Sequence, residues 1–144
     1  MNIMESLNVR NYLNKTLALK RQIKEAQSEL GYLEIIQYST QSNYYTEKVQ
    51  TSRSEDMVFE RNLIRKEAVI QKLENDKYIF LERSNQIIQW CFNLSVREAK
   101  YIQDRYLHDI PIDEIDYYSD RTIKRVIKKA IEKMQEHMDD KLCP

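Results

Sequence analysis

The stretch VRNYLNKTLALKRQIKEAQSELGYL, residues 9–33, repeats an apolar pattern every seven residues. One repeating position holds Val9, Thr16, Ile23 and Leu30, and the position three residues further on holds Tyr12, Leu19, Ala26 and Leu33. A seam of this kind over about four heptads, with charged residues elsewhere, is typical of a coiled coil or a helical hairpin. The pattern predicts one long helix over residues 8–37.

A second long helix is expected after a polar segment. Residues 38–53, YSTQSNYYTEKVQTSR, lose the helical pattern and are predicted to form a loop. Ser52 and Glu55 have capping-box spacing, which predicts a helix that starts near them and runs to about Phe92. Its apolar residues near heptad spacing are Leu63, Ile70, Leu73, Phe80, Ile87 and Cys91. Two helices of similar length joined by a loop predict an antiparallel, coiled-coil-like hairpin over residues 1–93.

Three shorter helical segments predict a small second domain over residues 94–144. Ser95 and Glu98 have capping-box spacing at the start of the first segment. Its apolar face is expected to consist of Val96, Ala99, Ile102 and Tyr106. Residues 112–117 are expected to form one or two helical turns, and Ser119 is a good N-cap for a last helix.

The composition agrees with an all-α chain and does not identify a partner. The 144 residues include one Gly and two Pro, fewer than a β-rich fold with many tight turns needs. Lys and Arg together number 23, as do Asp and Glu, so the net charge is zero. The first ten residues lack the apolar core of a signal peptide, and no run approaches transmembrane length. We therefore expect a cytoplasmic protein without a membrane partner.

Catalytic and metal sites are not expected. Cys91 and Cys143 belong to no CxxC pair, and His108 and His137 lack metal-finger spacing. The sequence contains no Gly-rich phosphate loop and no convincing nucleophile–base pair. The chain is therefore predicted to be no enzyme and to need no cofactor.

The stretch SDRTIKRVIKKAIEKM, residues 119–134, is the strongest functional signal, since it holds six basic residues and two acidic ones. On a wheel of 100° per residue, Ile127, Ala130 and Met134 fall within about 40° of Ile123. The cations Arg121, Lys124, Arg125 and Lys128 fall on the opposite side. The recognition helix of a helix-turn-helix domain needs one apolar face and one cationic face near its N-terminus.

Other interpretations of this helix stay open. A basic helix face is often only a solvated surface. A membrane-surface helix would carry larger apolar residues than Ile, Val, Ala and Met. The order of three short helical segments favours a helix-turn-helix, although residues 109–116, DIPIDEID, place four acids beside the basic helix.

The segment LSVREAKYIQDRYLHDIPIDEI, residues 94–115, together with residues 119–134, resembles the helix-turn-helix of a known family. This is the RinA/ArpU type of phage late transcriptional regulator, whose C-terminal unit is similar to region 4 of sigma-70 factors. The matching features are the Arg105-Tyr106-Leu107 helix end, an Ile-containing short helix, Ser119, the Arg121-Thr122-Ile123 start and Ala130. The chain departs from the family's Ile-Ala-x-x-Leu-Gly-x-Ser pattern before Ser119, because the turn Gly is absent. If Ile115 matches the Ile of the pattern, the segment is three residues too short. If Ile112 matches it, the length is right, but Asp113 replaces the Ala and Asp116 replaces the Leu.

The resemblance implies a transcription activator of late genes that binds double-stranded phage DNA and acts with host RNA polymerase. The hairpin is expected to serve dimerisation or polymerase contact, so we expect a homodimer in the bacterial cytoplasm. The residues that the resemblance assigns to DNA binding, together with the neighbouring Lys129, are Arg121, Thr122, Lys124, Arg125, Lys128 and Lys129. The alternative is a coiled-coil adaptor whose degenerate helix-turn-helix binds a protein, such as RNA polymerase or a host regulator. The atypical positioning segment and the neutral net charge favour that alternative.

Overall fold

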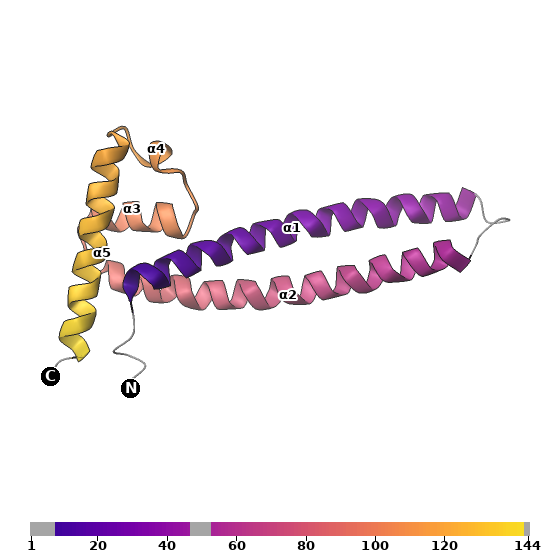
Figure 1. Ribbon diagram of the computed structural model, residues 1–144, viewed down its shortest axis with the longest axis horizontal. Helices are drawn as coiled ribbons and strands as arrows, with labels where there is room; N and C mark the ends of the chain where they lie inside the picture. The colour runs from indigo at the N-terminus through magenta and orange to yellow at the C-terminus, as the bar shows by residue number, and fades with distance from the viewer. Residues whose placement is uncertain (1–7, 47–52, 143–144) are drawn as a thin grey trace. The chain divides into compact units, whose positions relative to one another are not determined.

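The computed structural model describes residues 8–46 and 53–142, and all regular secondary structure in these ranges is helical (Figure 1). The helices are α1 (Val9–Thr46), α2 (Arg53–Cys91), α3 (Val96–Tyr106), α4 (Ile112–Ile115) and α5 (Asp120–Leu142). The predicted all-α class is confirmed. No helix in the described ranges combines the length and apolar character that crossing a membrane requires.

The predicted loop over residues 38–53 is wrong for most of its length. Helix α1 continues through Thr46 and α2 already begins at Arg53, so the segment between them is short. The loop was predicted from polar composition alone, but polar residues do not end a helix by themselves. Residues 38–46 contain no Gly or Pro that would stop the helix. The expected Ser52 cap lies outside the described residues, as do the side chains of Tyr38, Tyr44 and Tyr45. The expected end of the second helix near Phe92 agrees with α2.

Contacts divide the chain into two compact units, and each is described by itself. The first contains residues 1–21 and 79–144, and the second contains residues 22–78. The first unit therefore joins the first turns of α1 and the last turns of α2 to α3, α4 and α5. The predicted division into residues 1–93 and 94–144 stays a prediction.

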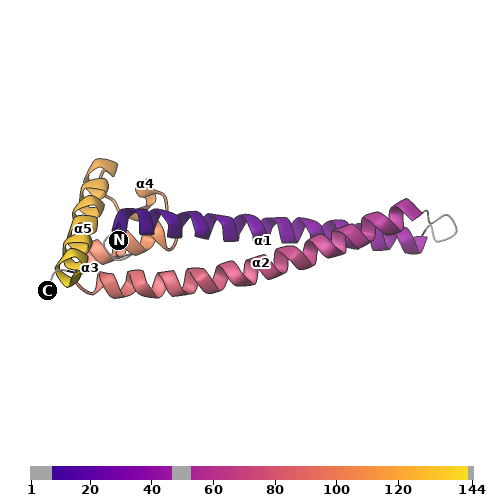
Figure 2. The same ribbon diagram turned by 60° about the horizontal axis from the view of Figure 1, so that its bottom comes forward.

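In the second unit, α1 and α2 run side by side in opposite directions (Figures 1 and 2). The buried apolar residues between them are Ile23, Ala26, Leu33, Val69 and Leu73. Arg65 forms an ion pair with Glu29 at 2.6 Å across the two helices. The predicted α1 seam thus points inward here, whereas Leu63 of the predicted α2 seam is exposed. Leu73 of that seam is buried as predicted, and the buried position beside the half-buried Ile70 is Val69, which the prediction did not include.

In the first unit, one apolar core connects all five helices. Its buried members are Val9, Leu13, Leu17, Ile87, Trp90, Cys91, Tyr101, Ile102, Tyr106, Leu107, Ile115, Ile123, Ile127, Ala130, Ile131 and Met134. The start of α1 is also held by a polar contact, because the Val9 N–H donates to Gln135 Oε1 of α5 at 2.8 Å. The ends of the two long helices therefore form the base on which α3, α4 and α5 pack.

Candidate nucleic-acid interface

The start of α3 is fixed by a capping box, as its sequence predicts. The Glu98 N–H donates to Ser95 Oγ at 3.2 Å, and the Ser95 N–H donates to Glu98 Oε1 at 3.2 Å. Lys133 of α5 adds a bond to the same carboxylate oxygen at 2.9 Å. Burial would raise the pKa of Glu98, but the bonds from Lys133 and Ser95 outweigh it, so the pKa lies below its ordinary value. This carboxylate thus ties α5 to α3.

The turn after α3 is held onto α1. Asp109 has a left-handed backbone with φ of 52°, a conformation in which Asp is tolerated better than most residues. Its carboxylate accepts two bonds from Arg21, from Nε at 3.3 Å and from Nη2 at 3.2 Å. The Ile110 N–H donates to the Asp104 carbonyl oxygen at 3.0 Å. These contacts fix the direction in which the chain enters α4.

The turn between α4 and α5 is anchored on α3 by a polar network. The buried Tyr101 donates its hydroxyl proton to Asp116 Oδ2 at 2.5 Å, and Arg97 Nε donates to the Tyr101 oxygen at 3.1 Å. Lys100 Nζ donates to the Ile115 carbonyl oxygen at 2.9 Å. The bond from Tyr101, followed by the Tyr117 N–H, lowers the pKa of Asp116 below its ordinary range. The network sets where α5 begins.

The N-terminus of α5 has the predicted serine cap. The Thr122 N–H donates to Ser119 Oγ at 3.3 Å, and the Ser119 and Thr122 hydroxyl oxygens lie 3.0 Å apart in a further hydrogen bond. Asp120 occupies the first turn, where a negative charge offsets the positive end of the helix dipole. The Thr122 hydroxyl is therefore engaged in the cap, and its side chain is half-buried.

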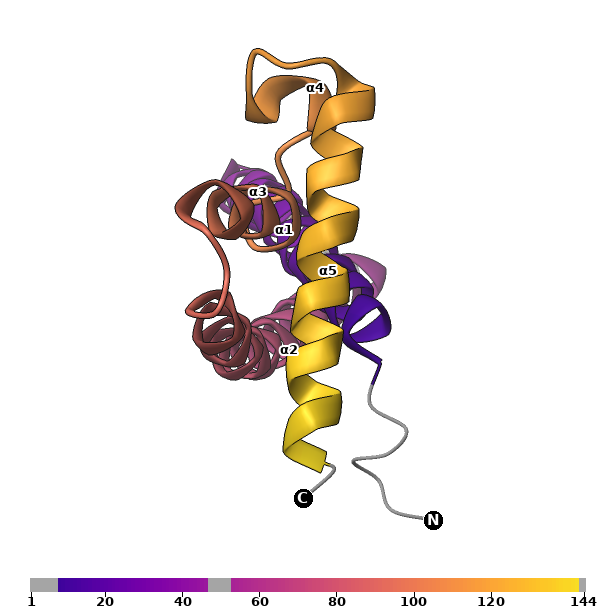
Figure 3. The same cartoon turned by 90° about the vertical axis from the view of Figure 1, so that its left-hand side faces the viewer.

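One side of α5 packs on the rest of the unit, as the helical wheel predicts. Its buried residues are Ile123, Ile127, Ala130, Ile131 and Met134. Figure 3 shows α5 crossing α3, with α4 near the N-terminal end of α5 and the start of α1 and the end of α2 behind it. The burial of this side fixes the opposite side toward solvent.

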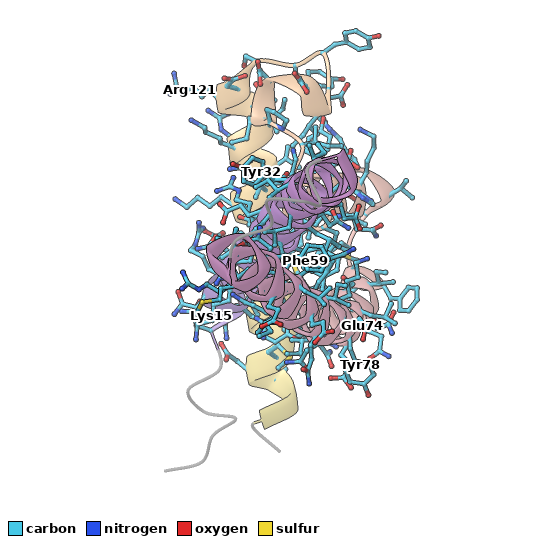
Figure 4. All side chains as sticks on the ribbon, turned by 90° about the vertical axis from the view of Figure 1, so that its right-hand side faces the viewer. Lys15, Tyr32, Phe59, Glu74, Tyr78 and Arg121 are labelled. Atoms are coloured by element: carbon cyan, nitrogen blue, oxygen red, sulfur yellow. The ribbon has the colours of Figure 1, made fainter. Side chains whose placement is uncertain are left out.

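The outward side of α5 carries the predicted cations. Its exposed basic residues are Arg121, Lys124, Arg125, Lys128 and Lys129. Within the described part of the chain, none of these five belongs to an ion pair, whereas Lys133 forms one with Glu98. Figure 4 shows Arg121 at the N-terminal end of α5. The structure thus brings five of the six predicted site residues to one solvent-facing surface, named here the cationic face.

An acidic segment lies near the N-terminal end of α5 (Figure 3). Helix α4 is a single turn of four residues that packs against α5. It buries Ile115, but Asp113 and Glu114 are exposed. The same segment ends in Tyr117 and Tyr118, which are also exposed. The segment is short and acidic, as predicted, whereas the hydrogen bond between Tyr101 and Asp116 was not predicted.

Val96, which was expected to pack, is exposed instead, and so is Phe92 after α2. Val96 is 89% exposed, because the buried side of α3 is formed by Glu98, Tyr101, Ile102 and Tyr106. Trp90 is buried and packs edge-on against Tyr12 with ring centroids 4.8 Å apart, but Phe92 is 80% exposed. The prediction that Val96 belongs to the apolar face of the helix was therefore wrong.

Metal binding has no support in the described residues, since no three His, Cys, Asp or Glu side chains there lie close enough together to hold an ion. Comparison of the chain with protein-family models, curated proteins and solved structures found no match. The resemblance to phage late regulators therefore stays a prediction based on residues 94–134.

Proposed function

We propose that this chain is a phage-type transcriptional regulator that binds double-stranded DNA through the cationic face of α5 and activates late genes in the cytoplasm of its bacterial host. The observation that carries the proposal is the absence of ion pairs on that face within the described residues. A helix whose cations are already neutralised has little to offer a phosphate, whereas these five side chains are available to an anionic partner.

The position of the cations along α5 supports major-groove binding. Arg121, Lys124 and Arg125 lie in the first two turns of the helix, and residues in that part of a recognition helix contact base edges. Arginine is suited to bidentate bonds with guanine O6 and N7. Lys128 and Lys129 lie one turn further on, where phosphate contacts are expected. The Ser119 and Thr122 cap leaves Thr122 a supporting role at the helix N-terminus.

The supporting experiment measures binding to DNA fragments from the chain's own genetic neighbourhood, with random DNA as competitor, at about 50 and about 200 mM salt. We expect one fragment to be retained against the competitor and its binding to weaken with salt. Four to six phosphate contacts give a slope of about −4 to −5 when log K is plotted against log salt.

Two double variants distinguish DNA binding by the cationic face from a general effect of removing positive charge. Arg121→Ala/Arg125→Ala should lose about 1–3 kcal/mol of binding free energy for each arginine that contacts a base. Lys15→Ala/Lys24→Ala removes the same charge from exposed positions of α1 and should bind almost as wild type; Lys15 is labelled in Figure 4. Unchanged DNA binding by the double-arginine variant would remove the proposal.

A second candidate is a coiled-coil adaptor that binds a protein through the same C-terminal unit. The observation that favours it is the one-turn α4, whose exposed Asp113 and Glu114 would lie near DNA phosphates. A positively charged protein surface would accept these acids, whereas DNA would repel them. Asp113→Asn/Glu114→Gln should tighten DNA binding under the first proposal and weaken capture of RNA polymerase under the second.

A further inference from the structure

Helix α2 carries a second apolar side that the described chain leaves uncovered. Leu81 is 59% exposed and Ile88 is 37% exposed. Phe92, directly after the helix, is 80% exposed, and its N–H still donates to the Gln89 carbonyl oxygen at 3.2 Å. Asn85 lies between them and is also exposed. Their successive spacings of four, three and four residues are those of a coiled-coil seam.

This side, named here the outer seam and formed by Leu81, Asn85, Ile88 and Phe92, differs from the side of α2 that packs in the core. The core side presents Ile87 and Cys91, which are 0% and 4% exposed. At 100° per residue, the two sides are about 120° apart around the helix axis. One helix in the first unit therefore carries two seams, of which one is covered.

The sequence of α2 limits the length of the outer seam. The same spacing reaches back to Tyr78, which is exposed, and then to Glu74. Figure 4 labels Tyr78 and Glu74 on one side of α2. When two identical helices pair in parallel, a carboxylate at a seam position lies opposite the equivalent carboxylate of the other copy. The two negative charges repel each other, so the seam is expected to end there. About two heptads remain, which suits a weak and reversible contact.

We propose that the outer seam binds the outer seam of a second copy, with the two α2 helices parallel. Numbered as a heptad, Asn85 takes an a position, and parallel pairing places it opposite Asn85 of the other copy. The two amides then satisfy each other, as single a-position asparagines do when they specify a two-stranded parallel register. Antiparallel pairing would place the amide opposite Ile88 or Leu81 and leave it without a partner, which is costly.

Charge complementarity supports the same register. In this heptad numbering Lys77 takes a g position and Glu82 takes the e position five residues later. A parallel pair brings g of one helix next to the following e of the other, so the twofold axis generates two Lys77–Glu82 contacts. Both side chains are exposed, and neither forms an ion pair within the described chain.

The inference deepens the proposed function, because a parallel pair brings two copies of α5 to the same end of the dimer. A palindromic DNA site needs two such helices about 34 Å apart, or a multiple of that. Self-association does not rest on DNA binding, however, and its test uses no DNA. The self-association proposal can therefore fail while the DNA-binding proposal holds, and the reverse.

Sedimentation equilibrium of the full chain over about 1–200 µM tests the contact, a range that covers weak interfaces. We expect the dimer fraction to rise with concentration and Ile88→Glu to weaken association about tenfold or more. The matched control is Ile79→Glu, because Ile79 lies on the same helix at nearly the same exposure, 38%, but off the seam. A chain that stays monomeric at about 200 µM, or a dimer weakened equally by both variants, would overturn the proposal.

Disulfide trapping tests the orientation in a Cys143→Ser background. Cys91 interferes little, since burial raises the pKa of its thiol to about 11 and keeps it protonated. With oxidised glutathione as oxidant, Leu81→Cys, which keeps Asn85, should form a disulfide between the equivalent positions of two parallel helices, whereas Ile79→Cys should not. A dimer in which Leu81→Cys gives no cross-link would overturn the parallel register.

Discussion

Helices α2 and α5 bury one side each in the same core but present opposite chemistry to solvent. On α5 the outward residues are cations such as Lys124 and Lys128, whereas the outward residues near the end of α2 include the apolar Leu81 and Ile88, with Phe92 directly after the helix. The inward sides are alike, because both bury apolar residues four positions apart in this core, Ile87 and Cys91 on α2 and Ile123 and Ile127 on α5. The buried pattern therefore determines the fold, while the partner of each helix must be sought in the side chains that the fold leaves exposed.

The largest effect is expected from breaking the inward side of α5. Ile127→Ala deletes buried methyl and methylene groups and leaves a cavity in the core. Such substitutions cost about 2–5 kcal/mol of unfolding free energy. Chemical denaturation followed by circular dichroism measures this loss. Because the cationic face is presented only when the inward side of α5 is packed in the core, DNA binding should fall in proportion to the folded fraction. Full DNA binding by an unfolded variant would contradict this dependence.

A smaller effect is expected at the start of α3. Ser95→Ala removes the hydroxyl that accepts the Glu98 N–H and should cost about 1 kcal/mol of unfolding free energy. Ser95→Thr keeps a capping oxygen and is the matched control. A loss in the threonine variant as large as that in the alanine variant would show that the cap contributes little.

Local signals in the sequence predicted the starts of α3 and α5. Contacts between residues far apart in the sequence could not be predicted from such signals. The Ser95 box and the Ser119 cap involve residues three apart, so the order of residues alone determined them. The Arg21–Asp109 pair joins residues 88 positions apart, and nothing in either neighbourhood points to the other. Phe92 illustrates the same difficulty, because an apolar residue at a helix end is equally suited to packing inward or to facing a partner.

Acidification should weaken the contact between α3 and α5. The folded pKa of Glu98 lies below its ordinary value, so the native state favours the charged carboxylate. Its contribution to stability is therefore present above the ordinary pKa and is lost as the pH falls through the folded pKa. Thermal unfolding between pH 7 and pH 3 measures the effect. Glu98→Gln should flatten this dependence, although Asp116, whose pKa is also lowered, keeps part of it. An unchanged pH dependence in that variant would contradict the role given to the carboxylate.

The smallest effect on folding is expected from Lys128→Ala, which tests the outward side of α5 alone. Lys128 is exposed and forms no ion pair within the described residues, so the unfolding free energy should change by no more than about 0.5 kcal/mol. Its loss should nevertheless weaken binding to every DNA sequence by a similar factor and reduce the salt slope by about 1, because a phosphate contact carries no sequence information. Arg121→Ala should instead reduce the preference among sequences. Titration of both variants against the retained fragment and random DNA distinguishes these roles, and equal effects of the two variants on sequence preference would mean that the cationic face attracts DNA without reading it.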